Sequence, residues 1–223
     1  MATTLAQLRQ NRLNVDLGLD LTLTSGDGDV VFGTTAVRNQ AIMVALAKLW
    51  PRMARLVVES TSPTTTTLEY SLSTLRDVEA IDLIGGTAAQ PVDKANNFRF
   101  LYDESTPSAP IRRLRLPSAP GNSAFTSIRV IGYVPYKSEL SGDSDTLDLP
   151  VEYEWVAVTG ARAEIYRRKL NERVNYERFN ISNRDNDVTV NELLTLYQVA
   201  SREFDDAIVM HRRGFSTGHT FRP

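Results

Sequence analysis

The spacing of apolar residues changes twice along this chain of 223 residues, and these changes limit the folds it can adopt. Near both ends, apolar side chains recur every three or four residues, which is the period of an amphipathic helix. Between about Leu56 and Tyr136 they alternate with polar residues, which is the period of a half-buried strand. The pattern predicts an α+β fold, with a helical core and an inserted antiparallel β-sheet or small barrel.

The N-terminal region predicts two helices and a strand between them. A short helix is expected over Thr4–Asn11, and the alternation over Val15–Leu23 predicts a half-buried strand. A stronger helix begins at about Thr35. Pro51 must end or kink this helix near Trp50, because proline has no backbone N–H to donate.

The middle of the chain predicts several short strands. The run Leu56-Val57-Val58 is a candidate for the start of the sheet. Breaks rich in proline and glycine separate the later apolar alternations, as in an antiparallel sheet. These alternations fall at Leu68–Leu72, Phe98–Tyr102, Leu114–Leu116 and Ile128–Val130.

The C-terminal third predicts two long helices that pair antiparallel. Asp148-Leu149-Pro150 opens the first, which runs to about Phe179, because proline is tolerated in the first turn. Thr189-Val190-Asn191-Glu192 is a capping box that starts the second, and Gly214 is a plausible stop. The polar face of the first helix carries Glu164, Arg167, Arg168 and Arg178. The residues expected in the core are Trp50, Trp155, Leu170, Leu194, Tyr197 and Phe204.

These elements divide the chain into four parts. Residues 1–54 form an N-terminal helical and extended segment, and residues 55–140 form the β-rich insertion. Residues 141–213 form a helical hairpin that completes the core, and residues 214–223 form a docking tail. No stretch approaches the roughly 20 apolar residues of a membrane span, and the N-terminus lacks the apolar region of a secretion signal. We therefore expect a soluble protein with no membrane contact.

The residue types exclude several kinds of chemistry. The chain has no cysteine, which excludes disulfides, thiolate catalysis and cysteine-based zinc sites. Its two histidines, His211 and His219, both lie near the C-terminus, which is a poor place to build a rigid catalytic site. No Gly-Lys-Ser/Thr sequence is present to form a phosphate loop. We expect no catalytic residue, no cofactor and no enzymatic activity.

Acidic clusters also lack a catalytic or metal-binding pattern. Asn183–Asp187 resembles the start of a calcium loop, but Val188 replaces the required glycine and Leu194 replaces the bidentate glutamate. The clusters Asp143/Asp145/Asp148 and Asp205/Asp206 have no base or nucleophile at a recognisable spacing. Surface solvation and helix-end electrostatics explain them best, so we expect no metal site.

Two basic segments are candidates for contacts with other molecules. The formal net charge is −2, which is not typical of a free nucleic-acid-binding protein. Arg112, Arg113, Arg115 and Arg129 lie on predicted strands, where a solvated face, an inter-subunit contact or a phosphate contact remain alternatives. The basic C-terminal tail is interpreted either as a frayed end or as a segment that docks into a partner. Its candidate docking residues are His211, Arg212, Arg213, Phe215, Phe221 and Arg222.

The order of these segments resembles the head-to-tail adaptor (connector) proteins of tailed bacteriophages. The resemblance lies in the opening segment Thr4–Gln10 and in the helix that ends Ala45-Leu46-Ala47-Lys48-Leu49-Trp50-Pro51. It continues in the Asp143-Ser144-Asp145 loop and in Asp148-Leu149-Pro150 at the start of a long helix. A second long helix and a basic tail complete it. The β-rich middle exceeds the minimal all-helical form of that family.

This resemblance implies a structural virion protein in the phage neck, assembled in the host cytoplasm. The family forms a homo-oligomeric ring of about twelve copies. The ring binds the portal protein on one side and a stopper or tail-terminator protein on the other, and genomic DNA passes through without specific binding. The tail from His211 to Pro223 would dock on the portal. Candidate ring or lumen contacts are Arg112, Arg113, Arg115, Arg167, Arg168 and Arg178.

Three other functions compete with this interpretation. The chain is alternatively another neck or tail-completion protein, because β-rich middles are common in such components. It is alternatively a nucleic-acid-binding module that uses Arg112, Arg113 and Arg115. A hydrolase is the weakest of the alternatives, because no catalytic constellation supports it.

Overall fold

A computed structural model describes residues 3–18, 33–64, 66–85, 90–95, 97–103, 111–119, 125–179 and 190–211. For residues 90–94, 173–179 and 190–192 it describes the backbone alone. The chain divides into a helical unit, made of residues 1–53 and 136–213, and a β unit whose described part lies within residues 54–135. The predicted α+β class is confirmed.

The N-terminal segment is helical from Leu5 to Asp16. It consists of α1 (Leu5–Leu8), the π-helical turn η1 (Arg9–Leu13) and α2 (Asn14–Asp16). The strand predicted over Val15–Leu23 is wrong at its start, because Val15 and Asp16 belong to α2, and residues 19–23 lie outside the described residues. The burial of leucines at helical spacing outweighs the two-residue alternation that follows. The buried leucines are Leu5, Leu8, Leu13 and Leu17.

Helix α4 (Thr35–Leu49) begins and ends where the sequence predicts. The Thr34 hydroxyl accepts a hydrogen bond from the Val37 N–H at 3.4 Å and caps its N-terminus. The helix stops before Trp50 and Pro51, as the missing donor of proline requires. Its buried side is formed by Arg38, Ala41, Ile42, Ala45, Leu46 and Leu49.

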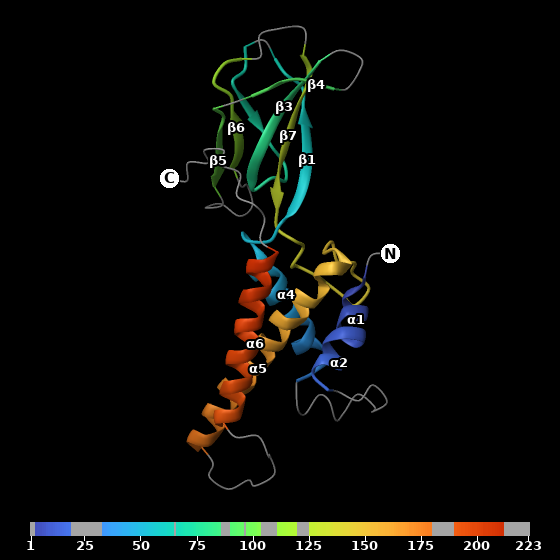
Figure 1. Cartoon of the computed structure of the whole chain (residues 1–223), viewed down its shortest axis with the longest axis vertical. Coiled ribbons are helices and arrows are strands. Elements are labelled where there is room, and N and C mark those ends of the chain that lie inside the picture. The colour runs from blue at the N-terminus through green and yellow to red at the C-terminus, as the bar shows by residue number, and fades with distance from the viewer. Residues whose placement is uncertain are drawn as a thin grey trace. The chain divides into compact units, whose positions relative to one another are not determined.

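Two long antiparallel helices complete the helical unit, as predicted. The 3-10 turn η2 (Val151–Tyr153) follows Pro150 and leads into α5 (Glu154–Phe179). Helix α6 (Val190–Met210) returns beside α5 in the opposite direction (Figure 1). The predicted capping residue Thr189 and the predicted stop Gly214 lie outside the described residues.

Helix α5 is the centre of the helical core. Its residues from Val156 to Ala161 are buried on every side, because α4, α6 and η1 all contact it. Of the six expected core residues, Phe204 is buried, whereas Trp50, Leu170 and Tyr197 are half-buried. The prediction is wrong for Trp155 and Leu194, which are exposed. Helix periodicity shows that an apolar stripe exists, but α6 turns a neighbouring stripe inward, formed by Ala200, Phe204, Ala207 and Ile208.

The segment between the β unit and α5 belongs to the helical unit. The expected boundary after residue 140 lies instead at 135/136, because Tyr136 and Leu140 are buried in the helical core. Backbone hydrogen bonds fasten the later part of this segment to the N-terminus, among them one from the Ala6 N–H to the Asp143 carbonyl at 3.0 Å. The Leu5 N–H donates to the Asp145 carbonyl at 2.9 Å, and the Leu147 N–H donates to the Thr3 carbonyl at 2.9 Å.

The β unit holds two antiparallel sheets. One has the strand order β1–β7–β3–β4, and the other has the order β2–β6–β5, so each is an open sheet with two edges. The four-stranded sheet comprises β1 (Arg55–Thr61), β3 (Asp77–Gly85), β4 (Gln90–Lys94) and β7 (Phe125–Val134). The three-stranded sheet comprises β2 (Glu69–Ser71), β5 (Arg99–Asp103) and β6 (Ile111–Arg115).

The strands predicted from apolar alternation are confirmed. The runs at Leu56–Val58, Leu68–Leu72, Phe98–Tyr102, Leu114–Leu116 and Ile128–Val130 correspond to β1, β2, β5, β6 and β7. Strand β7 keeps the alternation most clearly, with every second side chain buried from Ile128 to Val134. The two sheets share an apolar core that includes Leu75, Ile81 and Leu114. No helix in the described ranges is long and apolar enough to span a membrane.

Candidate interaction surfaces

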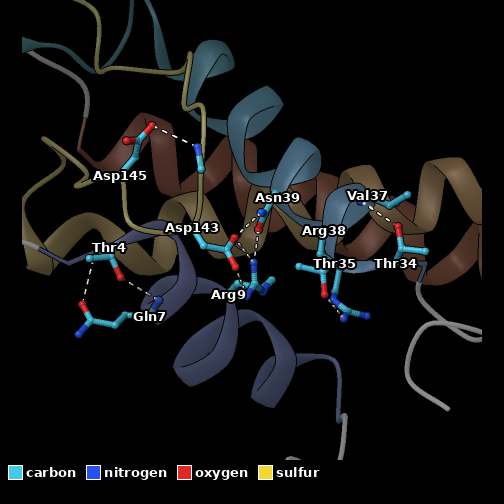
Figure 2. Close-up of polar contacts among 11 residues, drawn as sticks. Thr4, Gln7, Arg9, Thr34, Thr35, Val37, Arg38, Asn39, Asp143 and Asp145 are labelled. Carbon is cyan, nitrogen blue, oxygen red and sulfur yellow. Dashed lines mark hydrogen bonds and ion pairs between the residues drawn. The ribbon is translucent and has the colours of Figure 1, made fainter. Parts of the chain in front are cut away.

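Arg9, Asn39 and Asp143 form a polar cluster that joins three distant segments of the helical unit (Figure 2). The Arg9 guanidinium donates two hydrogen bonds to the Asp143 carboxylate, at 2.7 and 3.0 Å. Arg9 also donates to Asn39 Oδ1 at 2.7 Å, and Asn39 Nδ2 donates to Asp143 at 2.8 Å. The hydrogen bonds from Arg9 and then Asn39 lower the pKa of Asp143 to about 2.

The neighbouring acid, Asp145, holds the turn that presents Asp143. Its carboxylate accepts hydrogen bonds from the Ser141 N–H at 2.6 Å and from the Ser141 hydroxyl at 3.0 Å, which lower its pKa. Asp148 likewise accepts from the Lys137 N–H at 2.8 Å. Asp143, Asp145 and Asp148 therefore each fix local structure through a named partner, in addition to the surface solvation and helix-end electrostatics that the sequence predicts for them. The exposed pair Asp205 and Asp206 agrees with that interpretation.

A true capping box stands at the N-terminus of α1. The Gln7 N–H donates to the Thr4 hydroxyl at 3.2 Å, and the Thr4 N–H donates to Gln7 Oε1 at 2.9 Å (Figure 2). The Thr-x-x-Gln spacing in the sequence was a sufficient signal for it. The cap sets the start of the segment that delivers Arg9.

A second polar cluster surrounds Glu164 on α5. The Glu164 side chain is 2% exposed, although the sequence places it on the polar face of the helix. Its carboxylate accepts from Arg167 at 3.0 and 2.6 Å and from Arg168 at 3.1 Å, and Lys48 Nζ lies 3.5 Å away. These cations, Arg167 first, lower its pKa to about 2 against the effect of burial.

This cluster defines the surroundings of two candidate ring contacts. Arg168 donates to Gln40 Oε1 at 3.0 Å, which ties α5 to α4. Arg167 and Lys48 remain about half exposed while they neutralise Glu164. Each of these two cations can therefore contact a partner molecule through its exposed side. The side chain of the third candidate on this helix, Arg178, lies outside the described side chains.

A third cluster lies on another side of α5. Arg162 Nη1 is 3.1 Å from the Asp16 carboxylate, and Arg162 Nη2 donates to Glu203 of α6. Burial raises the pKa of the nearby Tyr166 phenol, and the charges of Asp16 and Glu203 act in the same direction. One guanidinium therefore links α2, α5 and α6.

Large apolar side chains are exposed around this third cluster. Trp155 is 44% exposed and Met210 is 75% exposed. Leu196 and Val199, on the same side of α6 as Glu203 by helical spacing, are also exposed. An exposed group of large apolar residues in a helical unit is typical of a protein-binding surface.

His211, the first candidate residue of the docking tail, closes the described part of the helical unit. Its ring centroid lies 5.2 Å from that of Tyr153 and 5.6 Å from that of Trp155, with an edge-on geometry toward the tryptophan. The first candidate residue of the tail therefore packs beside Trp155. The remaining tail residues, Arg212, Arg213, Phe215, Phe221 and Arg222, lie outside the described residues.

The three arginines of β6 do not act as one group. Arg113 and Arg115 are exposed, and each has a guanidinium nitrogen 3.8 Å from the Glu69 carboxylate. Arg112 alternates with them along the strand; it donates to the Ser73 carbonyl and lies 5.9 Å from the centre of the Tyr102 ring. The strand register adds Arg99, which stands directly opposite Arg115. The proximity of Arg99 to Arg115 follows from the pairing of β5 with β6 and is not visible in the sequence.

The polar clusters have the composition of structural contacts. Among the described side chains, no group of three or more histidine, cysteine, aspartate or glutamate residues is placed to hold a metal ion. In the clusters around Asp143, Glu164 and Arg162, carboxylates are paired with guanidinium groups, which are always protonated and cannot exchange protons with a substrate. Their arrangement neutralises charge and positions helices.

Comparisons with known proteins give little further information. No family model matches this sequence, and no curated protein matches it. Among solved structures, a chain of the "Neck of empty GTA particle computed with C6 symmetry" is similar over 88% of this chain and 89% of that chain. The sequence identity is 16% and the TM-score is 0.28, and a match at this level carries no argument about this chain.

Proposed function

We propose that this chain is a structural protein of a tailed-phage neck, a head-to-tail adaptor that joins the portal to the stopper or tail. It forms a homo-oligomeric ring around the channel through which genomic DNA passes. It works in the virion at the portal vertex, after assembly in the host cytoplasm. It turns over no substrate.

One observation carries this proposal. The segments on which the adaptor resemblance rests are brought together by direct contacts in the helical unit. Arg9, from the opening segment, and Asn39, from the helix that ends at Pro51, both bind Asp143 in the Asp143-Ser144-Asp145 loop. The fourth resembling segment, Asp148-Leu149-Pro150, opens α5. Segments that are distant in sequence thus form one packed unit, which supports a shared architecture.

The surfaces of the helical unit also support a binding role. Exposed Trp155 and Met210 offer apolar area, while the cations around Glu164 offer charge. A ring repeats each such contact at every subunit boundary, so modest contacts suffice for a stable assembly. The tail that begins at His211 is proposed to dock on the portal.

The test is reconstitution of the full-length chain with the portal protein of the same phage. Mass photometry and negative-stain electron microscopy are expected to show a ring of this chain bound to the portal. Deletion of residues 212–223 is expected to weaken portal binding and leave the circular dichroism spectrum unchanged. A chain that stays monomeric and unbound in the presence of its portal would contradict the proposal.

A second candidate function rests on Arg99, Arg113 and Arg115, whose guanidinium groups are exposed in the three-stranded sheet. Like charges directly opposite one another destabilise a strand pair unless an anion balances them, and nucleic-acid phosphate is one such anion. Retention of duplex DNA at physiological salt, lost in Arg113→Gln/Arg115→Gln, would support this candidate. The proximity of Glu69 to both residues argues for weak binding.

A further inference from the structure

Two faces of the helical unit differ in charge and in the kinds of side chain that they expose. The acidic face combines the exposed stripe of α6 with its neighbours on α5 and α2, and consists of Asp16, Trp155, Arg162, Leu196, Val199, Glu203, Asp206 and Met210. The basic face combines residues of α4 and α5, and consists of Gln40, Ala47, Lys48, Arg167 and Arg168. The members of each face are joined by ion pairs, by hydrogen bonds or by helical spacing.

The α6 stripe is regular and faces solvent. Its members follow one another at intervals of three and four residues, which places them on one side of the helix. Val199 is 51% exposed, and Leu196 and Met210 are also exposed. Glu203 and Asp206 stand between these apolar residues and are exposed as well. The stripe thus alternates apolar contact area with negative charge.

Charge on the two faces is complementary. The acidic face carries three carboxylates, Asp16, Glu203 and Asp206, against the guanidinium groups of Arg162 and of Arg202, which lies beside the stripe by the same helical spacing, so its net charge stays negative. The basic face carries three cations against Glu164, whose carboxylate is buried beneath them. The negative charge of Glu164 is therefore hidden from a partner while Lys48 and Arg167 remain accessible. Opposite charge steers two such faces together and sets their register.

The two faces point in different directions around α5. Glu164 and Arg167 follow Arg162 by two and five residues, so they lie roughly 200° and 140° around the helix axis from it. The two faces also differ in residue type, because the large apolar side chains of Trp155 and Met210 are exposed on the acidic face and the small Ala47 is exposed on the basic face.

We propose that the acidic face of one copy binds the basic face of the next copy of this chain. Because the two faces are different, the contact is heterologous, and its repetition generates a head-to-tail ring. This inference rests on the proposed function, which supplies the ring, and adds the two surfaces that build it. In the assembly, Glu203 and Asp206 face Lys48 and Arg167 of the adjacent subunit.

Cross-linking tests the proposal directly, because the chain has no cysteine of its own. The double variant Ala47→Cys/Val199→Cys places one thiol on each face. Treatment of its portal-bound assembly with a short bis-maleimide is expected to give a ladder of covalent multimers. Each single variant is expected to stay monomeric on a denaturing gel. Replacing Val199→Cys by Val58→Cys, at a β1 valine that is 53% exposed, is the matched control and is expected to give no ladder.

Charge variants test the heterologous geometry. Val199→Lys blocks the acidic face by placing an ammonium group opposite Lys48 and Arg167 of the neighbour, and Ala47→Glu blocks the basic face by placing a carboxylate opposite the acids of the neighbour. Each is expected to abolish rings, while the control variants Val58→Lys and Val58→Glu leave them intact. An equal mixture of the two blocked variants is expected to stop at a dimer, because one intact face of each kind remains. Unchanged thermal melting curves establish that the variants are folded.

The outcomes separate the two proposals. If Val199→Lys and Ala47→Glu still form rings, and the double-cysteine variant gives no ladder, this inference is overturned and the adaptor function is left intact. Covalent dimers of Val199→Cys alone would also overturn it, because they indicate a symmetric contact. A wild-type chain that stays monomeric with its portal would overturn both proposals.

Discussion

The carboxylate of Glu164 accepts two hydrogen bonds from the guanidinium of Arg167, one turn further along α5, at 3.0 and 2.6 Å. Glu164 is 2% exposed, whereas the Arg167 side chain is 46% exposed. The Glu164 carboxylate is therefore shielded from solvent, whereas the Arg167 side chain remains in contact with solvent. Burial of the carboxylate is tolerated because Arg168 and Lys48 complete its surroundings.

Replacement of Glu164 by glutamine is expected to lower the free energy of unfolding of the helical unit by about 1–3 kcal/mol. The amide keeps the shape of the side chain but loses the charge-assisted hydrogen bonds to Arg167 and Arg168. Urea denaturation followed by circular dichroism at neutral pH measures the change. Glu172→Gln, at a 64%-exposed residue paired with Lys169, is the control and is expected to cost under about 0.5 kcal/mol. Equal losses in the two variants would contradict the role of burial.

The stabilising effect of Glu164 is expected to disappear in acid. Its pKa is lowered from 4.5 to about 2, so the folded state holds the proton less tightly than the unfolded state does. The stabilisation is therefore complete above about pH 4.5 and is lost as the pH falls toward about 2. Urea melts of the wild type and of Glu164→Gln, taken between pH 6 and pH 2, are expected to converge over this window. A difference in stability between the two proteins that stays constant from pH 6 to pH 2 would contradict the assignment of this pH dependence to Glu164.

Replacement of Arg9 by glutamine is expected to loosen the attachment of the N-terminal segment. Arg9 is buried and holds Asp143, whose backbone carbonyl accepts from the Ala6 N–H at 3.0 Å. Amide hydrogen exchange at Leu5 and Ala6 is expected to accelerate by about tenfold or more, which corresponds to about 1.4 kcal/mol of local stability.

The control for this variant is Gln10→Ala in the same segment, because Gln10 is exposed. Exchange at Leu5 is expected to stay near the wild-type rate in that variant. The amide of Val130 in β7 reports on the β unit and is expected to be unaffected by either change. Acceleration throughout the chain would indicate global destabilisation and would contradict a local role for Arg9.

Gly160 is expected to tolerate no side chain, because α4 and α6 both approach α5 there. A Cβ atom at this position would lie 2.6 Å from the Phe204 ring and 2.9 Å from Ala45 Cβ. Gly160→Ala is expected to lower the unfolding free energy by about 1–2 kcal/mol, since overpacking exceeds the gain in helix propensity. Gly142→Ala, where nothing lies within 4 Å, is the control and is expected to stay within about 0.5 kcal/mol of wild type. Thermal melts of the two variants and of the wild type measure these changes in stability. A Gly160→Ala variant more stable than the wild type would contradict the prediction, because it would show that the helices move apart to accommodate the methyl group.

Local sequence patterns were sufficient for most elements of this fold. The missing N–H of Pro51 ends α4, and Pro150 stands immediately before η2 and α5. Alternating apolar residues identified β7, because a strand with one buried face has a period of two. These features depend on neighbours a few residues away along the chain. Val15 and Asp16 show the limit of the method, since an alternating pattern began inside a helix.

The candidate surfaces were less accessible to sequence reasoning. Arg167 and Arg168 were identified as contact residues, but the carboxylate that organises them, Glu164, was placed on the polar face without a role. Arg99 was missed because its neighbour Arg115 is close through strand pairing alone. The sequence predicts no partner for Asp143, because Arg9 and Asn39, which bind it, are distant from it along the chain.

The sequence by itself determined the α+β class, the ends of the helices at proline and the strands β1, β2, β5, β6 and β7, because periodicity and backbone chemistry are local properties. Strands β3 and β4 were found only in the structure. The tertiary structure alone decided which side of each helix is covered. Trp155 and Leu194 are exposed although their spacing fits an apolar stripe, and Glu164 is buried although it is charged. Burial depends on which neighbouring elements pack against a residue, and helix periodicity carries no information about those neighbours.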